Sequence, residues 1–284
     1  MRIVKPTIRY SITILLAIAM ILFLVINLAS STVLNKNYIL SKLEETDYYN
    51  KIYEDVKSNF EKYIHQSGLE ESVLEEIISK EKVKKDTELI ISNLYDGLEE
   101  KIDTQEIKDN LNKNIEKTIG NSKLIVTQKN AINTLINKIC DEYTTTISHY
   151  EYEKQINDGY VKIMKYIDVA KKALLVVIAV SAILLLGISI RRIYKAFSCL
   201  GICLMVSGMF FVIVNIFVNM KIKVQTILIL NDAISNTLRN ILTQLLNSIN
   251  SYGYIMLGIG IIIIIASNLI HNKLKYGNET YERT

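Results

Sequence analysis

Few residues in this chain have the types and spacing that metal binding or catalysis requires. His149 and Glu153 lie four residues apart in "SHYEYE", so on a helix they would share one face. Two such ligands are the start of a metal site, but a complete site needs three or four. The alternative, which we favour, places both side chains on the solvated face of a long helix. The sequence therefore predicts no catalytic residue, no cofactor-binding residue and no metal ligand.

The cysteines indicate no redox or zinc centre. Cys199 and Cys203 lie one helical turn apart in an apolar stretch, where cysteine usually acts as a small apolar side chain, and Cys140 lies alone. The sequence contains no glycine-rich phosphate loop, no nucleophile elbow and no zincin pair. We therefore expect a protein that is not an enzyme and uses no cofactor.

Four stretches of the chain are long and apolar enough to cross a membrane as helices. Hydrophobic residues make up 50% of the chain and charged residues 22%, and the two kinds are segregated along it. A helix of about 20 apolar residues spans the hydrocarbon layer. The sequence predicts transmembrane helices at residues 10–29, 173–190, 196–219 and 252–270.

The first of these stretches has an alternative interpretation as a cleaved signal peptide. Arg2, Lys5 and Arg9 form a basic start, and Ala29 begins a run of small residues. However, the apolar run exceeds the usual signal core of roughly 7 to 15 residues. An uncleaved anchor is the favoured interpretation, and cleavage stays open.

Basic residues predict which way the chain crosses the membrane. The short segments 1–9, 191–195 ("RRIYK") and 271–284 carry nine Lys and Arg against two Glu, whereas residues 36–172 carry 21 Lys against 26 Asp and Glu. Lys and Arg accumulate on the cytoplasmic side of membrane proteins. We therefore expect a bacterial plasma-membrane protein with both termini cytoplasmic, and with residues 30–172 and 220–251 outside.

The large outer segment shows the pattern of a helical bundle. Ser67 with Glu70, and Asp103 with Glu106, have the spacing of helix N-caps, and Gly120 that of a helix stop. Apolar residues recur at helical spacing between these marks, in three stripes. The stripes are Tyr49, Ile52, Tyr53, Val56, Phe60 and Tyr63; Val83, Thr87, Ile90 and Leu94; and Ile107, Leu111, Ile115 and Ile119. The fold class is therefore an all-α integral membrane protein with an extracytoplasmic helical domain, which includes coiled-coil-like stripes.

Two further stripes extend toward the predicted spans. One runs from about Asn130 to Lys172, interrupted only by Gly159, and predicts a long helix that continues into the second span. The other runs from Ile227 to Ile249 within residues 220–251. We expect the second stripe to pack on the long helix, and the alternative is that it lies on lipid headgroups.

The predicted spans contain amides and glycines but no ionisable side chain at their centres. Asn27 and Asn215 would both lie toward the outer leaflet, where a hydrogen bond between them would join two helices; a polar pore lining that also involves Asn268 is the alternative. Glycines recur seven apart in the third span (Gly201, Gly208) and in the fourth (Gly253, Gly260). This spacing predicts close packing of the two spans.

The layout resembles two families of bacterial membrane proteins. A span, a helical domain and a second span, over residues 1–190, resemble the input half of chemoreceptors and sensor kinases. This resemblance implies a non-catalytic protein that binds or senses through its outer domain, by contact with a ligand, a wall component or a partner protein. Because "RRIYK" and residues 271–284 are short, a signal would pass through an associated protein.

The alternative function is a permease-like subunit of an ATP-driven transporter or envelope complex. One span, a large outer domain and three further spans resemble the cell-division and macrolide-export permeases over the whole chain. Both hypotheses imply the lipid bilayer and a protein partner, leave self-association open and exclude nucleic acid, because no extended basic surface is present.

Overall fold

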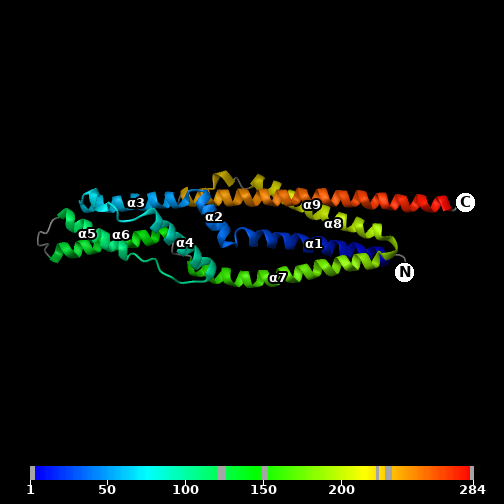
Figure 1. The fold of residues 1–284 in the computed structure, drawn as a ribbon, viewed down its shortest axis with the longest axis horizontal. Helices are drawn as coiled ribbons and strands as arrows, with labels where there is room; N and C mark the ends of the chain where they lie inside the picture. Colours follow the sequence, from blue (N-terminus) through cyan, green and yellow to red (C-terminus); the bar gives the residue numbers. More distant parts are fainter. Residues whose placement is uncertain (1–3, 120–125, 149–152, 222–223, 228–231, 282–284) are drawn as a thin grey trace. The chain divides into compact units, whose positions relative to one another are not determined.

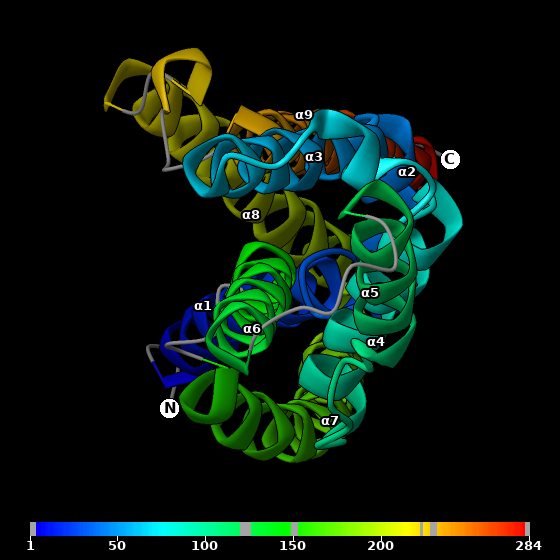
Figure 2. The ribbon, with the colours of Figure 1, turned by 90° about the vertical axis from the view of Figure 1, so that its left-hand side faces the viewer.

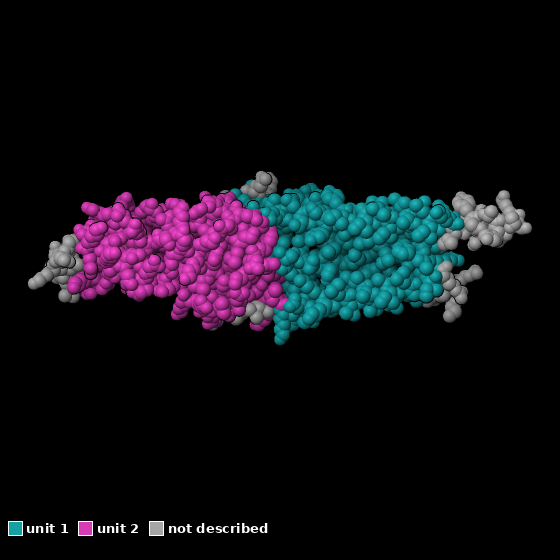
Figure 3. All heavy atoms as spheres, viewed as in Figure 1, with its two compact units in different colours: residues 1–33, 165–227, 239–284 teal, residues 34–164, 228–238 magenta. Residues whose placement is uncertain are grey.

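The computed structural model describes residues 4–119, 126–148, 153–221, 224–227 and 232–281, and these residues form nine α-helices and no strand (Figure 1). The all-α prediction is therefore confirmed. The described residues divide into two compact units, coloured separately in Figure 3. Unit 1 comprises residues 1–33, 165–227 and 239–284, and unit 2 comprises residues 34–164 and 228–238.

Five helices make up most of unit 2, and Figure 2 shows them in a second view. They are α2 (Lys36–Glu45), α3 (Tyr48–Ser67), α4 (Lys80–Asp96), α5 (Gln105–Ile119) and α6 (Val126–Ser148), with the 3-10 helix η1 (Glu71–Leu74) between α3 and α4. The predicted apolar stripes form the core: Ile52, Val56, Phe60, Val83, Ile107, Leu111 and Ile115 are all buried. Burial of these stripes holds α3, α4, α5 and α6 together, because each has apolar residues on one face.

One predicted helix start is wrong. Ser67 is the last residue of α3 and its Oγ donates to the Ile64 carbonyl oxygen, so it does not cap a new helix. The physical reason is Gly68, whose φ of 74° ends α3 in the left-handed conformation that glycine adopts most readily. Asp103 does act at the start of α5, since its Oδ1 accepts a hydrogen bond from the Gln105 backbone N–H at 2.9 Å.

The long helix predicted from Asn130 to Lys172 corresponds to two helices among the described residues. Its first part is α6, which ends at Ser148, and its second part is α7 (Glu153–Ile188). Gly159, the predicted interruption, lies inside α7. Residues 149–152, across which Tyr150 and Ile156 continue the helical spacing in the sequence, lie outside the described residues.

Among the described residues, four helices are long and apolar enough to cross a membrane. They are Pro6–Ser31 of α1 (Val4–Ser31), Lys162–Ile188 of α7, Ile193–Lys221, which is α8, and Asp232–Lys273 of α9 (Asp232–Tyr281). The prediction of four membrane-crossing helices is therefore confirmed at the level of helix length and composition. In unit 1, Leu16 and Ala17 of α1, Leu185 of α7, and Cys199 and Cys203 of α8 form a buried cluster.

The predicted close packing of the third and fourth spans is confirmed. A Cβ atom added at Gly208 of α8 would lie 2.7 Å from the Gly253 carbonyl oxygen of α9. One added at Gly260 would lie 2.8 Å from the Gly201 carbonyl oxygen. No side chain fits at these distances, so glycine is what allows the two backbones to approach.

Serine, rather than asparagine, supplies the hydrogen bonds between the spans. Ser267 Oγ of α9 donates to the Tyr194 carbonyl oxygen of α8 at 2.5 Å. Ser198 Oγ of α8 lies 2.8 Å from the same Ser267 Oγ. The expected bond between Asn27 and Asn215 is not formed: Asn27 is exposed, and Asn215 accepts from Asn219 along α8.

Helix α9 continues without a break from the predicted outer segment 220–251 into the predicted span 252–270. In unit 2, Ala233 is part of the buried core and Thr237 Oγ1 lies 2.7 Å from Thr46 Oγ1. This segment thus packs on the end of α2 and on the core of unit 2, to which α6, in the stretch of the predicted long helix, contributes Ile136 and Ile139.

The glycine contacts make a specific prediction about stability. We expect Gly208→Val to lower the free energy of unfolding by about 1–3 kcal/mol or more, because the new side chain forces α8 and α9 apart. Gly258→Val is the matched control, since nothing lies within 4 Å of a Cβ at that position of α9. Denaturant titration of the solubilised chain, followed by circular dichroism, measures both variants. Equal stabilities would contradict the proposed role of the glycines.

Candidate functional site

A charged network lies inside unit 2. Asp86 of α4 is 3% exposed, and its carboxylate accepts a hydrogen bond from Tyr143 Oη of α6 at 2.6 Å. Lys82, one turn earlier on α4, lies 3.0 Å from the same carboxylate and also donates to the Asp103 carbonyl oxygen at 2.9 Å. A buried carboxylate is tolerated when it is paired and hydrogen-bonded in this way. The network therefore joins α4, α6 and the start of α5.

Burial and the neighbouring Asp86 carboxylate both raise the pKa of Tyr143 above its ordinary value of 10. The hydroxyl consequently stays protonated and continues to donate at neutral pH. Because the pKa in the folded state is above that in the unfolded state, this contribution to stability is complete below about pH 10 and is lost as the pH rises further.

We expect Tyr143→Phe to lower the free energy of unfolding at pH 7 by about 1–3 kcal/mol, since Asp86 keeps only Lys82 as partner. The variant should also lose stability less steeply than the parent above about pH 10. Tyr166→Phe is the control, because that side chain is 72% exposed. Denaturant titrations at pH 7 and pH 10.5 provide the measurement, and a parallel loss in parent and Tyr143→Phe would contradict the assignment.

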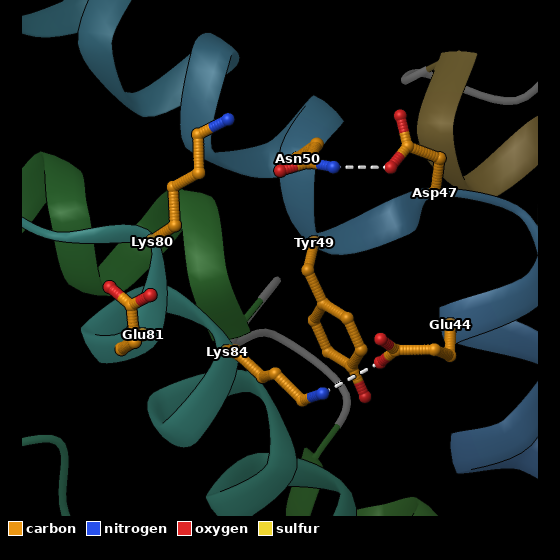
Figure 4. A pocket seen from close by; sticks show the side chains of 7 residues that line it. All are labelled: Glu44, Asp47, Tyr49, Asn50, Lys80, Glu81 and Lys84. Atoms are coloured by element: carbon orange, nitrogen blue, oxygen red, sulfur yellow. Dashed lines mark hydrogen bonds and ion pairs between the residues drawn. The ribbon is translucent and has the colours of Figure 1, made fainter.

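The surface of unit 2 has a polar pocket of about 140 Å³ between the α2–α3 turn and α4, which we call the Tyr49 pocket (Figure 4). Its lining residues are Glu44, Asp47, Tyr49, Asn50, Lys80, Glu81 and Lys84. The first four surround the short connection between α2 and α3, and the last three lie on the first turns of α4. Ser79, whose side chain accepts from the Lys82 backbone N–H, starts α4 at this point and so fixes the three residues.

An ion pair and an aromatic ring form one side of the Tyr49 pocket. Lys84 Nζ lies 2.7 Å from Glu44 Oε2 and 5.2 Å from the centre of the Tyr49 ring, and Figure 4 shows the ring beside this pair. Tyr49 Oη donates to Glu88 at 3.5 Å. Burial, followed by the charges of Glu88 and Glu44, raises the pKa of Tyr49, so the ring is neutral in the physiological range.

Asp47 is held in an unusual backbone conformation at the edge of the pocket. Its φ of 57° and ψ of 32° are left-handed, a region that non-glycine residues rarely occupy. Its carboxylate accepts a hydrogen bond from Asn50, drawn in Figure 4, and does not cap α3. Such a conformation costs roughly 1 kcal/mol or more and is found preferentially at functional sites.

The pocket also presents two charges that form no ion pair with a described residue. Lys80 lies 5.4 Å from the centre of the Tyr53 ring, and Glu81 follows it in the chain; both side chains are exposed. Opposite charges beside an aromatic ring suit a polar ligand that carries both an amine and an anionic group. None of the seven lining residues is a serine, cysteine or histidine.

A second pocket of unit 2, of about 210 Å³, lies on α3 and α6 around Glu142. The Glu142 carboxylate accepts hydrogen bonds from Asn59 Nδ2 at 3.1 Å and from Tyr63 Oη at 3.2 Å. Lys62 and Gln66 complete the lining. Because its carboxylate already has two partners within unit 2, this pocket offers less to a ligand than the Tyr49 pocket does.

The residues singled out from the sequence lie elsewhere. His149 and the side chain of Glu153 are outside the described residues, and among those described no three metal-ligating side chains gather. Cys140 is buried, which raises the pKa of its thiol, and Cys203 donates to Met20 Sδ within the spans. The Tyr49 pocket was missed because its residues match no motif. The available signal was the run of acidic residues followed by two tyrosines between Glu44 and Asn50.

No family model, curated protein or solved structure matches the chain.

Asp47 allows the pocket to be altered without disturbing the fold. We expect Asp47→Gly to leave the free energy of unfolding unchanged or raise it by up to about 1 kcal/mol, because glycine adopts a left-handed conformation freely. Asp47→Val should lower it by more than about 1 kcal/mol. The difference between the two variants in a denaturant titration is the measurement, and equal stability would show that the turn is not left-handed.

Proposed function

We propose that the chain is a non-catalytic, multi-pass protein of the bacterial plasma membrane that works by binding through unit 2 outside the cell. The observation that supports this proposal is the Tyr49 pocket, with its neutral aromatic ring and with Lys80 and Glu81, which form no ion pair with another described residue. The ligand it suits is a peptide segment with both charges, supplied by a partner protein or by the cell wall.

The orientation follows from charge. Unit 2 contains the acidic segment, and the segments between and beyond the spans in unit 1 are basic. With basic residues retained on the cytoplasmic side, both termini and residues 191–195 are cytoplasmic, and residues 36–172 are outside.

Cysteine labelling in intact cells tests the orientation. In a Cys140→Ala background, an impermeant thiol reagent should modify Lys101→Cys and should not modify Lys195→Cys until the cells are opened. Lys101 is exposed on the loop before α5, so its accessibility does not depend on unfolding. The reverse labelling pattern would invert the proposed orientation.

Site-specific photocrosslinking in cells tests the binding function. A photoreactive residue in place of Asn50 should form a crosslinked product, and one in place of exposed Lys57 on α3 should not. Adding Asp47→Gly, or Lys80→Gln with Glu81→Gln, should reduce the product by at least about fivefold, since a charge-assisted hydrogen bond is lost. Lys85→Gln, exposed on α4 but outside the pocket lining, is the matched control.

The crosslinked product also separates this function from the permease-like alternative. A product unaffected by the pocket variants would overturn binding at this pocket. Co-purification of a cytoplasmic ATPase with the solubilised full chain would favour the transporter subunit instead.

A further inference from the structure

The end of unit 1 at which α1 begins and α7 passes into α8 holds several positive charges in a small space. We call this group, Arg9, Ser189, Arg192 and Lys195, the basic end; Figure 1 shows the start of α1 and the α7–α8 junction at the same end of the unit. The Arg192 backbone N–H donates to the Ser189 carbonyl oxygen at 2.7 Å, and Arg9 and Arg192 both lie close enough to Lys195 for their charges to act on its ammonium group. Three cations from α1, η3 (Ile190–Arg192) and α8 therefore converge there.

No carboxylate of the surrounding sequence balances these charges. The chain has no Asp or Glu before Glu44, none between Asp168 and Asp232, and none from there to Glu279. Asp168 is about 20 residues before Ser189 on α7, which corresponds to roughly 30 Å of helix. Like charges repel, so an anion that joins the cluster would stabilise it.

Two polar atoms of the basic end are buried without a hydrogen-bond partner among the described residues. They are Arg9 Nε and Ser189 Oγ, and Ser189 is 4% exposed. A charge that serves only to orient a membrane protein is expected to face water. The Arg9 Nε–H is instead buried, so orientation alone does not explain its position. A buried donor without an acceptor is costly, which indicates that a further acceptor belongs at this place.

We infer that the basic end binds a phosphate group. A phosphate has several acceptor oxygens in a geometry that a guanidinium matches, so it satisfies Arg9 Nε and the Ser189 hydroxyl while neutralising Arg192 and Lys195. The source that fits the edge of a membrane span is the headgroup of an anionic phospholipid, and free phosphate has the same chemistry. This site is separate from the Tyr49 pocket and does not depend on the function proposed for that pocket.

An aromatic residue at the same place supports the assignment to the membrane surface. Tyr194 lies between Arg192 and Lys195 in the chain, its ring is 6.0 Å from Lys195 Nζ, and it stacks on His271 of α9 at 4.3 Å. Tyrosine is enriched at the level of lipid headgroups. The basic end therefore has both the charge and the aromatic residue that an interfacial headgroup site requires.

Lipid retention by the purified full chain tests the inference. The chain is exchanged into detergent micelles that contain phosphatidylglycerol and phosphatidylcholine, and bound lipid is counted by native mass spectrometry. The parent should retain phosphatidylglycerol preferentially. Arg9→Gln should reduce this preference by about tenfold, and Ser189→Ala, which removes no charge, should reduce it as well. Arg9→Lys keeps the charge but not the guanidinium, so a partial loss is expected.

The matched control is Lys273→Gln, which removes an equal charge from an exposed position of α9, two residues beyond His271. Its effect should be less than about twofold, because an exposed charge contributes little. Adding inorganic phosphate identifies the source: displacement of the lipid assigns the site to free phosphate, and retention assigns it to the headgroup. Equal losses in Arg9→Gln and Lys273→Gln, or no preference in the parent, would overturn the inference.

Discussion

The high cost of placing an ion in hydrocarbon is the constraint on which this structure depends. It removes charge from the centres of four long helices and concentrates charge in the segments between and beyond them. Without charge or an aqueous core, helices in lipid associate through close packing and a few hydrogen bonds. Helices α8 and α9 show both kinds of contact. Gly208 packs closely against Gly253, and Ser267 donates a hydrogen bond to the Tyr194 carbonyl oxygen.

The helices of unit 2 associate for a different reason, because each has an apolar stripe that is buried away from water. Val56, Phe60 and Leu111 supply that burial. Within the same core, the buried Asp86 carboxylate is tolerated because Tyr143 and Lys82 both face it. This requirement fixes the rotation of α6 relative to α4. Apolar contact alone would accept several rotations of α6 about its axis.

The sequence was sufficient where a pattern had one physical solution. Regular spacing of Ile107, Leu111 and Ile115 predicts a buried helix face, and the seven-residue spacing of glycines predicts a close helix contact; the structure has both. The sequence was insufficient where the local spacing of residues indicates one structure and the packing of the folded chain favours another. Ser67 has the spacing of an N-cap, but the burial of Ile64 keeps α3 helical as far as Ser67, and Gly68 ends the helix there.

Sites were harder to predict than helices, since the side chains that form them come from separate elements. Asp86 is a charged residue on a helix otherwise typical of a protein surface, and only the position of Tyr143, 57 residues later, shows that it is buried. The left-handed conformation of Asp47 has no sequence signal beyond the tolerance of aspartate for it. The Tyr49 pocket depends on both α3 and α4 and could not be found before they were placed.

The buried polar groups of this chain fall into two classes, those with hydrogen-bond partners in the protein and those without a partner among the described residues. Asn93 is 2% exposed, yet its amide donates to the Glu100 carbonyl and its oxygen accepts from the Glu100 N–H, so its hydrogen bonds are complete and its role is to hold the loop after α4. Asp86 is satisfied in the same way by protein partners. Arg9 Nε and Ser189 Oγ are equally buried and have no such partner among the described residues. Since folding alone gains nothing from a buried donor left unpaired, the difference separates groups that stabilise the fold from groups placed for a ligand.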